Sequence, residues 1–272
     1  MKKILFTTVN GILKPFKGRG LSETKIGKFV YEKIFIPNKP NHVEVEGFKL
    51  YLHEGGDLLS DSLLITKNYE PVETNIIRGI IKEGDIVVDA GANIGYYTVL
   101  LSKAAGPTGK VYAFEPGKEC FELLSRNVLE NNCSNVVLIN KALSDKEGDI
   151  KFYVNDKDKA SSSIFPLGNI LDGQSPSSIL KETSHLGTEV IVKATTLDAE
   201  IKEDIDFMKM DIEGAEFNGL MGGIELLKTC KKMIIEVPEV RKDFEDIQQL
   251  LRNNKYRIER LDEGNILCVK KK

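Results

Sequence analysis

The chain is predicted to be an α/β protein in which helices cover both faces of a doubly wound, mostly parallel sheet. From residue 69 onward, short apolar runs alternate with segments of helical period. The apolar run 86–90 leads directly into a small-residue loop and a helix start. The chain has 272 residues, 41% of them hydrophobic and 29% charged, which is enough to bury one large core.

Each element is expected from its own pattern of apolar and turn residues. Strands are expected at 48–54, 86–90, 110–115, 135–139, 149–154, 189–197, 205–211 and 231–237. Helices are expected at 69–85, 94–105, 117–131 and 214–228, and around Phe244 to Leu251. Pro71 suits the first turn of the helix 69–85 and Gly84 suits its end. The segments YRIERL and NILCVK, joined by Asp262–Asn265, are expected to form a closing hairpin with an antiparallel strand at the sheet edge.

The pattern also suggests how the chain is divided. Residues 1–60 are weakly patterned, and residues 1–68 are expected to form an N-terminal extension packing on a core domain of residues 69–272. An insertion at 146–196 interrupts the alternation with two strands and an intervening stretch rich in Ser, Gly and Pro. A long segment without a clear period is typical of a functional lid or a mobile loop.

The sequence VVDAGANIGYYT, residues 87–98, is the strongest candidate for a binding site. It places an acidic residue, a tight loop and a helix N-terminus at the carboxyl end of a strand, where α/β sheets bind ligands. Gly91 and Gly95 allow a sharp turn and a close approach to a ligand. Glu115 ends the next strand and can accept hydrogen bonds from both ribose hydroxyls. The alternative is that Asp89 only caps the turn and Glu115 is a solvated strand end.

The charges around this loop narrow the class of ligand. The loop is G-x-N-x-G, so neither the dinucleotide fingerprint nor a phosphate-binding G-K-[ST] motif is present. No Lys or Arg lies between Lys82 and Lys103, whereas Asp85 and Asp89 do. A pyrophosphate would favour positive charge here, and a ligand with an ammonium and a sulfonium favours negative charge. The predicted ligand is therefore S-adenosylmethionine.

Composition argues against several other classes. The net charge of −3 and the pI near 5.8 disfavour nucleic-acid binding through phosphates. The four cysteines form no C-x-x-C pair, which disfavours a zinc site or disulfide framework and indicates a reducing compartment. No signal peptide and no membrane span are recognised. A cytoplasmic protein is expected, and its oligomeric state is not predicted.

Five segments in order resemble the FkbM-type methyltransferase family: VVDAGANIGYYT, VYAFEP, NKALSD, TTLD and MKMDIEGAE. The resemblance covers roughly residues 69–237. It implies a class I methyltransferase fold with a reversed final hairpin, and S-adenosylmethionine as methyl donor. Family members typically methylate hydroxyl groups on sugars, glycans or polyketide-type natural products, so a glycan or small-molecule acceptor is expected.

The resemblance also assigns roles to individual positions. The family's cofactor-binding positions correspond to Asp89, Gly91, Asn93 and Gly95 in the loop, Glu115 for the ribose, Ala142 for the adenine and Glu70 for the methionine end. Asp211, Glu213 and Glu216 resemble the acidic segment at the mouth of the fourth strand.

A hydroxyl acceptor needs a base near the strand ends. Asp211 is the first candidate and Glu213 the second, and the alternative is that both only stabilise the following helix N-terminus. Together with Glu216 these carboxylates suggest a site for a divalent metal such as Mg²⁺ or Ca²⁺. However, Glu216 is more simply a solvated helix residue and no histidine cluster supports a metal, so none is predicted. His185 in the insertion can serve as a base but is more simply a surface residue.

Three alternatives remain for the function. One is a methyltransferase for carboxylate, protein or lipid-linked acceptors, and another is a non-catalytic binding protein with the same fold. The third is a nicotinamide dehydrogenase, which the missing G-x-G-x-x-G disfavours. No D-P-P-Y, N-P-P-Y or Pro-Cys sequence is present, which disfavours methylation of nucleic-acid bases on amino groups or on cytosine carbon.

Overall fold

The computed structural model describes residues 29–55, 57–155, 162–164 and 187–271. The chain divides into two compact units, Met1–Tyr69 and Glu70–Lys272. The described part of the first unit contains η3 (Tyr31–Phe35), α3 (Ile36–Asn38), β1 (His42–Val45), β2 (Phe48–Tyr51) and α4 (Leu58–Thr66). Strands β1 and β2 pair as an antiparallel hairpin, so the strand predicted at 48–54 is present but ends at Tyr51.

The second unit is built on a seven-stranded sheet with the order β11-β12-β10-β9-β3-β4-β5. The strands are β3 (Ile86–Ala90), β4 (Lys110–Phe114), β5 (Val136–Ile139), β9 (Phe207–Met210), β10 (Lys232–Glu236), β11 (Tyr256–Arg260) and β12 (Asn265–Lys270). Strand β12 alone runs against its neighbours β10 and β11. The reversed strand of the hairpin therefore lies one place inside the sheet, and not at its edge as expected from the sequence, because β11 is the edge strand.

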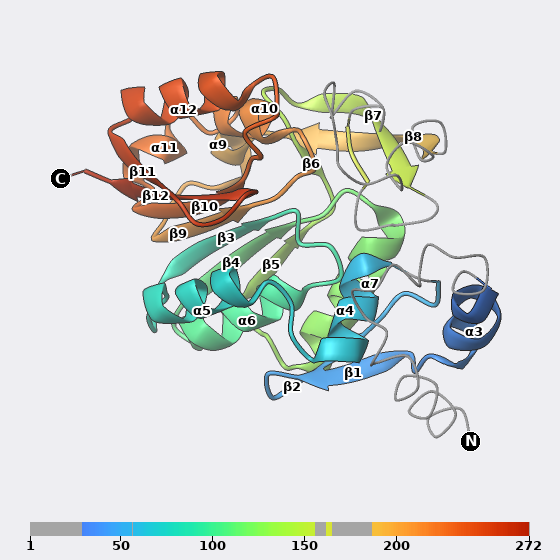
Figure 1. Ribbon diagram of the computed structural model, residues 1–272. Coiled ribbons are helices and arrows are strands. Elements are labelled where there is room, and N and C mark those ends of the chain that lie inside the picture. Colours follow the sequence, from blue (N-terminus) through green and yellow to red (C-terminus); the bar gives the residue numbers. More distant parts are fainter. Residues whose placement is uncertain (1–28, 56, 156–161, 165–186, 272) are drawn as a thin grey trace. The chain divides into compact units, whose positions relative to one another are not determined.

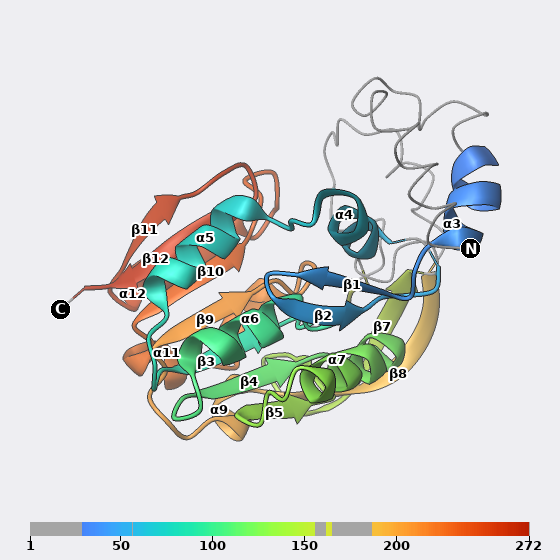
Figure 2. The ribbon, with the colours of Figure 1, turned by 90° about the horizontal axis from the view of Figure 1, so that it is seen from below.

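Helices cover both faces of this sheet (Figures 1 and 2). One face carries α5 (Pro71–Ile80), α6 (Tyr96–Ala105) and α7 (Lys118–Glu130). The other carries α9 (Leu197–Glu200), α10 (Glu216–Met221), α11 (Leu226–Thr229) and α12 (Phe244–Asn253). The predicted class is confirmed: a doubly wound, Rossmann-like class I methyltransferase sheet with a C-terminal antiparallel hairpin.

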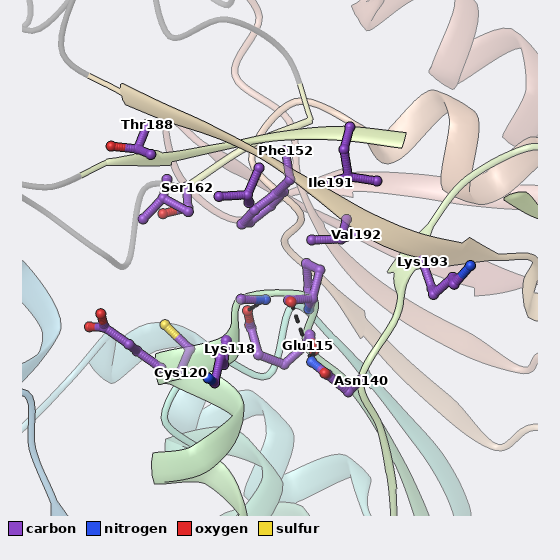
Figure 3. A pocket seen from close by; sticks show the side chains of 15 residues that line it. Glu115, Lys118, Cys120, Asn140, Phe152, Ser162, Thr188, Ile191, Val192 and Lys193 are labelled. Carbon is purple, nitrogen blue, oxygen red and sulfur yellow. Dashed lines mark hydrogen bonds between the residues drawn. The ribbon is translucent and has the colours of Figure 1, made fainter. Parts of the chain in front are cut away.

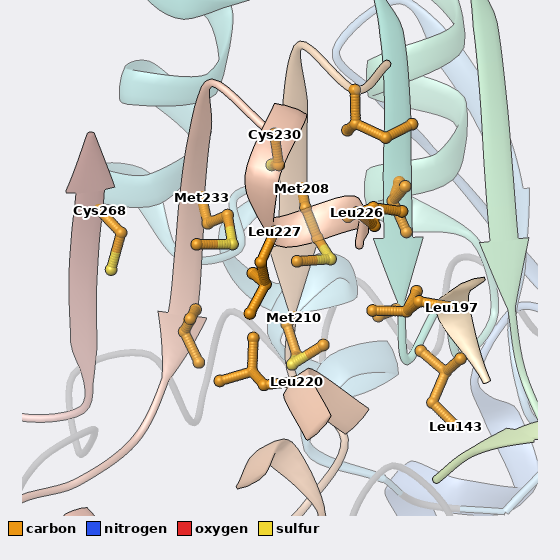
Figure 4. Packing of buried hydrophobic residues seen from close by; sticks show 14 of the residues in the cluster. Leu143, Leu197, Met208, Met210, Leu220, Leu226, Leu227, Cys230, Met233 and Cys268 are labelled. Atoms are coloured by element: carbon orange, nitrogen blue, oxygen red, sulfur yellow. The ribbon is translucent and has the colours of Figure 1, made fainter. Parts of the chain in front are cut away.

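Alternation along the central strands determines which side chains reach each face. Val88 and Ala90 of β3 and Met208 and Met210 of β9 belong to the buried cluster on the side of α9 to α12. Figure 4 shows Met208 and Met210 facing leucines of α10 and α11. The intervening residues of the two strands, which include Asp89 and Lys209, are on the opposite face. Asp89 and Lys209 are thus a buried polar pair on adjacent central strands, near their carboxyl ends.

Two predicted helices have different bounds in the structure. The helix expected at 69–85 ends at Ile80, and Gly84 lies in the turn before β3 with φ 87°. The helix expected at 214–228 is divided into α10 and α11 at Gly222 and Gly223. A Cβ on Gly222 would lie 2.0 Å from the carbonyl oxygen of Ser144. The main chain therefore passes too close to its neighbour for any side chain at this position, and the close passage accompanies the break.

The insertion contributes a second, three-stranded sheet with the order β6-β8-β7. Its strands are β6 (Ala142–Leu143), β7 (Gly148–Asn155) and β8 (Gly187–Thr195), and β7 and β8 pair antiparallel over eight residue pairs. Both strands predicted in the insertion are present, although the second ends at Thr195. Of the intervening stretch, residues 162–164 are described, and His185 lies outside the described residues.

Candidate cofactor and active site

The loop after β3 turns through left-handed backbone conformations at Gly91, Asn93 and Gly95, with φ of 87°, 51° and 93°. Gly95 is the N-cap of α6, as the predicted strand, loop and helix order requires. A Cβ on Gly91 would lie 1.8 Å from the carbonyl oxygen of Asp211. The close approach at Gly91 is therefore a contact between the main chains that follow β3 and β9.

Glu115, at the end of β4, is 7% exposed, so it is not a solvated strand end. Its Oε2 accepts a hydrogen bond from the Asn93 backbone N–H at 2.9 Å, and Oε1 accepts one from the Gly117 N–H at 2.7 Å. Burial raises the pKa of the Glu115 carboxyl to about 7, and the two N–H donors oppose that shift. The carboxylate joins the loops after β3 and β4, and each oxygen has a second lone pair for a ligand donor.

Two buried oxygens next to this joint have no hydrogen-bond partner in the described structure: Oδ1 of Asp89 and Oδ1 of Asn93. Asp89 is 1% exposed, and its other oxygen accepts a hydrogen bond from Thr98 Oγ1 at 2.5 Å. Burial raises the pKa of the Asp89 carboxyl to about 6, while the Lys209 charge opposes the shift. Unsatisfied buried acceptors cost about 1–3 kcal/mol each, so a ligand with hydrogen-bond donors would relieve both.

Three further carboxylates, Glu70, Asp211 and Glu236, form what we call the acidic group. One oxygen from each lies within 4.8 Å of the others. Asp211 directly follows β9, and Glu236 is the last residue of β10, the adjacent parallel strand. Glu70 is the N-cap of α5 in a left-handed conformation, and its Oε2 accepts a hydrogen bond from Tyr97 Oη at 2.8 Å. The carboxyl edge of the sheet thus gathers acids from three separate parts of the chain.

Lys209 supplies a buried positive charge to the acidic group. Its Nζ lies 2.9 Å from Oδ2 of Asp211 and 4.7 Å from the centroid of the Tyr97 ring. Burial would lower the pKa of Lys209, but the neighbouring carboxylates, Asp211 first, outweigh it and raise that pKa. The pKa of Glu236 is raised well above its usual range, chiefly by the Asp211 charge and then by burial. One lysine therefore faces three acids, and a cationic ligand is favoured at this edge.

The loop of residues 211–215, which we call the acidic loop, is fixed by hydrogen bonds to the Glu216 carboxylate. Glu216 is 1% exposed, which corrects the expectation of a solvated helix residue. Its Oε1 accepts the backbone N–H groups of Ile212 and Gly214, and its Oε2 pairs with the Arg241 guanidinium. The carboxylates of Asp211, Glu213 and Glu216 thus do not form the metal-like group raised from the sequence. Among the residues that the structure describes, the set of three acids that could hold a cation is the acidic group.

Lys209, Tyr97 and Glu236 were not among the site residues predicted from the sequence. Glu236 gives the same signal as Glu115, an acid at the end of a buried apolar run. Lys209 is a lysine inside the apolar run that forms β9. Both signals can be recognised in the sequence. That Lys209 and Glu236 lie close together depends on the pairing of β9 with β3 and β10, which cannot be predicted from the sequence pattern alone.

A cavity of about 580 Å³ lies beside Glu115, between the turn after β4 and the β7–β8 hairpin (Figure 3). This volume is in the range of small-molecule sites. Phe152 and Val192 come from the hairpin side, and Asn140, on the opposite side, donates a hydrogen bond to the Glu115 carbonyl at 2.7 Å. Ala142, expected near the adenine, is buried in β6 against Ala194 of β8 and does not line this cavity. Asn140, two residues earlier, does.

The seven-stranded sheet with β12 reversed, and the glycine loop after β3 joined to the buried Glu115 carboxylate, define the class of protein as an S-adenosylmethionine-dependent class I methyltransferase. Residues 89–258 match the FkbM methyltransferase domain, and the chain belongs to that family, which confirms the resemblance. The methyltransferase sdnD of Sordaria araneosa is 29% identical over 196 residues, which cover 64% of this chain and 74% of that protein.

Two solved structures are similar at lower identity. The FkbM methyltransferase of Methylobacillus flagellatus KT shares 15% identity over 78% of this chain and 52% of its own, with a TM-score of 0.45. An rRNA methylase from Streptococcus thermophilus shares 12% identity over 74% of this chain and 95% of its own, with a TM-score of 0.44. Likenesses this distant carry no information about the acceptor. In the described part of the chain, no helix has the length and apolar character that a membrane span needs.

Proposed function

We propose that this protein transfers the methyl group of S-adenosylmethionine to a hydroxyl oxygen of a sugar, a glycan or a small-molecule natural product. The observation that carries the proposal is the buried Glu115 carboxylate, which is joined to the Asn93 backbone at the edge of the cavity. A buried carboxylate there suits two ribose hydroxyls. The proposed setting is the cytoplasm, in keeping with four buried free cysteines.

The residues present fit the cofactor. Glu115 would hold the ribose hydroxyls, and the cavity bounded by Asn140 and Phe152 would take the adenine end. The orphaned oxygens of Asp89 and Asn93 would accept hydrogen bonds from the ligand, and Glu70 in the acidic group would face the ammonium of its methionine end. When bound, S-adenosylmethionine supplies an electrophilic methyl group on a sulfonium.

Asp211 is the proposed base for the acceptor hydroxyl, and Glu213 is the second candidate. The Asp211 side chain is 19% exposed at the carboxyl edge of the sheet, so an acceptor can reach it. Glu236 lies beside it with a pKa raised chiefly by the Asp211 charge, so the acidic group favours taking up a proton. We therefore propose that the acceptor proton passes to the acidic group, first to Asp211.

The proposal is tested with a panel of hexoses, glycans and polyketide-type alcohols, S-adenosylmethionine as donor, and mass spectrometry for a gained methyl group. Asp211→Asn is expected to lower turnover about 10²- to 10⁴-fold while calorimetry shows unchanged affinity for S-adenosylhomocysteine. Glu213→Gln is run beside it. Glu259→Gln, on the exposed face of β11, is the matched control. Methylation confined to carboxylates or proteins would overturn the hydroxyl assignment, and full turnover in Asp211→Asn would return Asp211 to a structural role.

A further inference from the structure

The insertion contacts the acidic loop through one buried serine. Ser163 is 0% exposed, and its Oγ donates a hydrogen bond to the carbonyl oxygen of Glu213 at 2.5 Å. Its own backbone is fixed on β7, since its N–H donates to the Tyr153 carbonyl at 3.1 Å and its carbonyl accepts the Tyr153 N–H at 2.7 Å. Ser163 therefore connects β7 of the insertion to the loop that follows β9.

The loop that receives this hydrogen bond has an unfavourable backbone conformation. Glu213 and Gly214 have φ of 52° and 100°, so two consecutive residues are left-handed and one of them is not glycine. Such a conformation persists only where the surroundings hold it. The Glu216 carboxylate and Arg241 hold one side of the loop, and Arg241 Nη2 donates to the Gly214 carbonyl at 2.9 Å. Ser163 supplies a hydrogen bond from the insertion.

The strand that carries this bridge also lines the cavity. Phe152 and Val154 of β7 flank Tyr153 and line the cavity beside Glu115. Ser162, next to Ser163, lines it too, and its Oγ accepts the Asn155 N–H at 3.1 Å. The wall of the cavity and the support of the acidic loop are thus the same short piece of the insertion.

We propose that Ser163 is a positioning residue that holds the acidic loop, with Asp211 and Glu213, in register with the cavity that takes the cofactor. The inference rests on the proposed function, since it gives the insertion a part in that same site. Removing the hydroxyl removes this hydrogen bond to the Glu213 carbonyl and lets the loop relax. The base then loses its alignment with the acceptor, while the contacts of Glu115 with the cofactor stay intact.

The test compares Ser163→Ala with Ser125→Ala in the full-length chain. Ser125 is the matched control because its Oγ also donates to a backbone carbonyl, that of Phe121, at 2.7 Å on α7. Hydrogen exchange followed by mass spectrometry is expected to show faster exchange in residues 212–216 of Ser163→Ala only. Turnover of that variant is expected to fall about 10- to 100-fold, with affinity for S-adenosylhomocysteine within about twofold of wild type.

A second variant keeps the test decisive if the alanine variant folds poorly. Ser163→Cys is nearly isosteric and keeps a weak donor. Its turnover and its hydrogen-exchange rate in residues 212–216 are expected to lie between those of wild type and Ser163→Ala. Wild-type exchange in residues 212–216, or unchanged turnover, in both variants would overturn the role of Ser163. Failure of wild type to methylate any acceptor would instead count against the proposed function, and the exchange measurement would then decide the role of Ser163 alone.

Discussion

Lys209 and Asp211 lie two residues apart at the carboxyl end of β9 and form an ion pair, with Nζ 2.9 Å from Oδ2. The lysine side chain is 4% exposed and the aspartate side chain 19%. The lysine is thus enclosed by the protein while its partner remains within reach of solvent. This asymmetry lets Lys209 balance the acidic group from inside and leaves Asp211 accessible to an acceptor.

Replacing Lys209 with methionine keeps the length of the side chain but leaves the acidic group without its cation. Breaking a buried pair by removal of one partner costs about 3–5 kcal/mol, so the free energy of unfolding of Lys209→Met is expected to fall by that order. Urea unfolding measures it. Lys231→Met, which breaks the exposed Lys231–Asp206 pair, is the control and is expected to lose at most about 1 kcal/mol. Equal losses in the two variants would contradict the role given to Lys209.

Ligand affinity is expected to depend on pH through Glu115. Its pKa of about 7 in the free protein means that the carboxylate is mostly protonated at pH 6 and mostly ionised at pH 8. Only the ionised form accepts from both ribose hydroxyls while it keeps its two N–H bonds, so affinity for S-adenosylhomocysteine is expected to rise with pH, up to about tenfold per unit below the pKa. Calorimetry at pH 6, 7 and 8 measures the trend. Glu115→Gln is expected to bind more weakly and to lose this part of the trend, and parallel pH profiles in the two proteins would contradict it.

Gly91→Ala is expected to disrupt the joint between β3 and β9. The substitution places a methyl group 1.8 Å from the Asp211 carbonyl oxygen at φ 87°, so the acidic loop must move. We expect a lower thermal midpoint and weakened binding of S-adenosylhomocysteine. Gly79→Ala in α5 is the matched control, since the added Cβ would have no atom within 4 Å beyond its chain neighbours and the backbone of its own helix, and alanine favours helix by roughly 0.5–1 kcal/mol. A Gly91→Ala protein as stable as Gly79→Ala would contradict the close contact.

Stability is also expected to depend on pH through Glu73 of α5. Glu73 is buried, and burial together with a hydrogen bond to Asp262 raises its pKa to about 7. The pKa of Asp262 falls to about 2, because Glu73 donates to it, as do the Gly264 and Asn265 N–H groups. The folded state therefore retains a proton on Glu73 that the unfolded chain releases above its ordinary value of 4.5.

The direction in which stability changes with pH follows from the difference between the folded and unfolded pKa of Glu73. Because the folded pKa of Glu73 is raised, its contribution to stability is complete below pH 4.5 and is lost as the pH rises through 7. The urea midpoint of wild type is expected to fall between pH 5 and pH 7.5 by more than that of Glu73→Gln, whose amide still donates to Asp262 and does not titrate. An equal change in the two proteins would show that Glu73 titrates normally.

Much of the sheet could be predicted from local pattern. The central strands are short apolar runs that end at turn or acidic residues: β3, β4, β9 and β10. Their alternation with helical segments was enough to predict the α/β fold class. The place of β12 was wrong because a hairpin sequence does not state which of its two strands pairs with the parallel sheet. The helix at 214–228 was wrong because its apolar stripe continues across Gly222, where a backbone contact to Ser144 interrupts it.

The site was predictable where one residue carries a local signal. Asp89, Glu115 and Asp211 each end or follow an apolar run, and all three lie at the carboxyl edge of the sheet. The hydrogen bond from Ser163 to Glu213 and the ion pair of Glu216 with Arg241 join residues far apart in the chain. No pattern in either segment announces such a contact, because it depends on how the insertion and the loops pack.

The assignment of the cofactor site is tested by calorimetric titration of the wild-type protein with S-adenosylmethionine, S-adenosylhomocysteine and NAD, each repeated with Glu115→Ala. We expect the first two to bind and NAD not to bind. Glu115→Ala is expected to weaken the binding of S-adenosylmethionine and S-adenosylhomocysteine by at least about tenfold, the equivalent of one charge-assisted hydrogen bond. Binding of NAD alone, or undiminished binding by Glu115→Ala, would contradict this assignment.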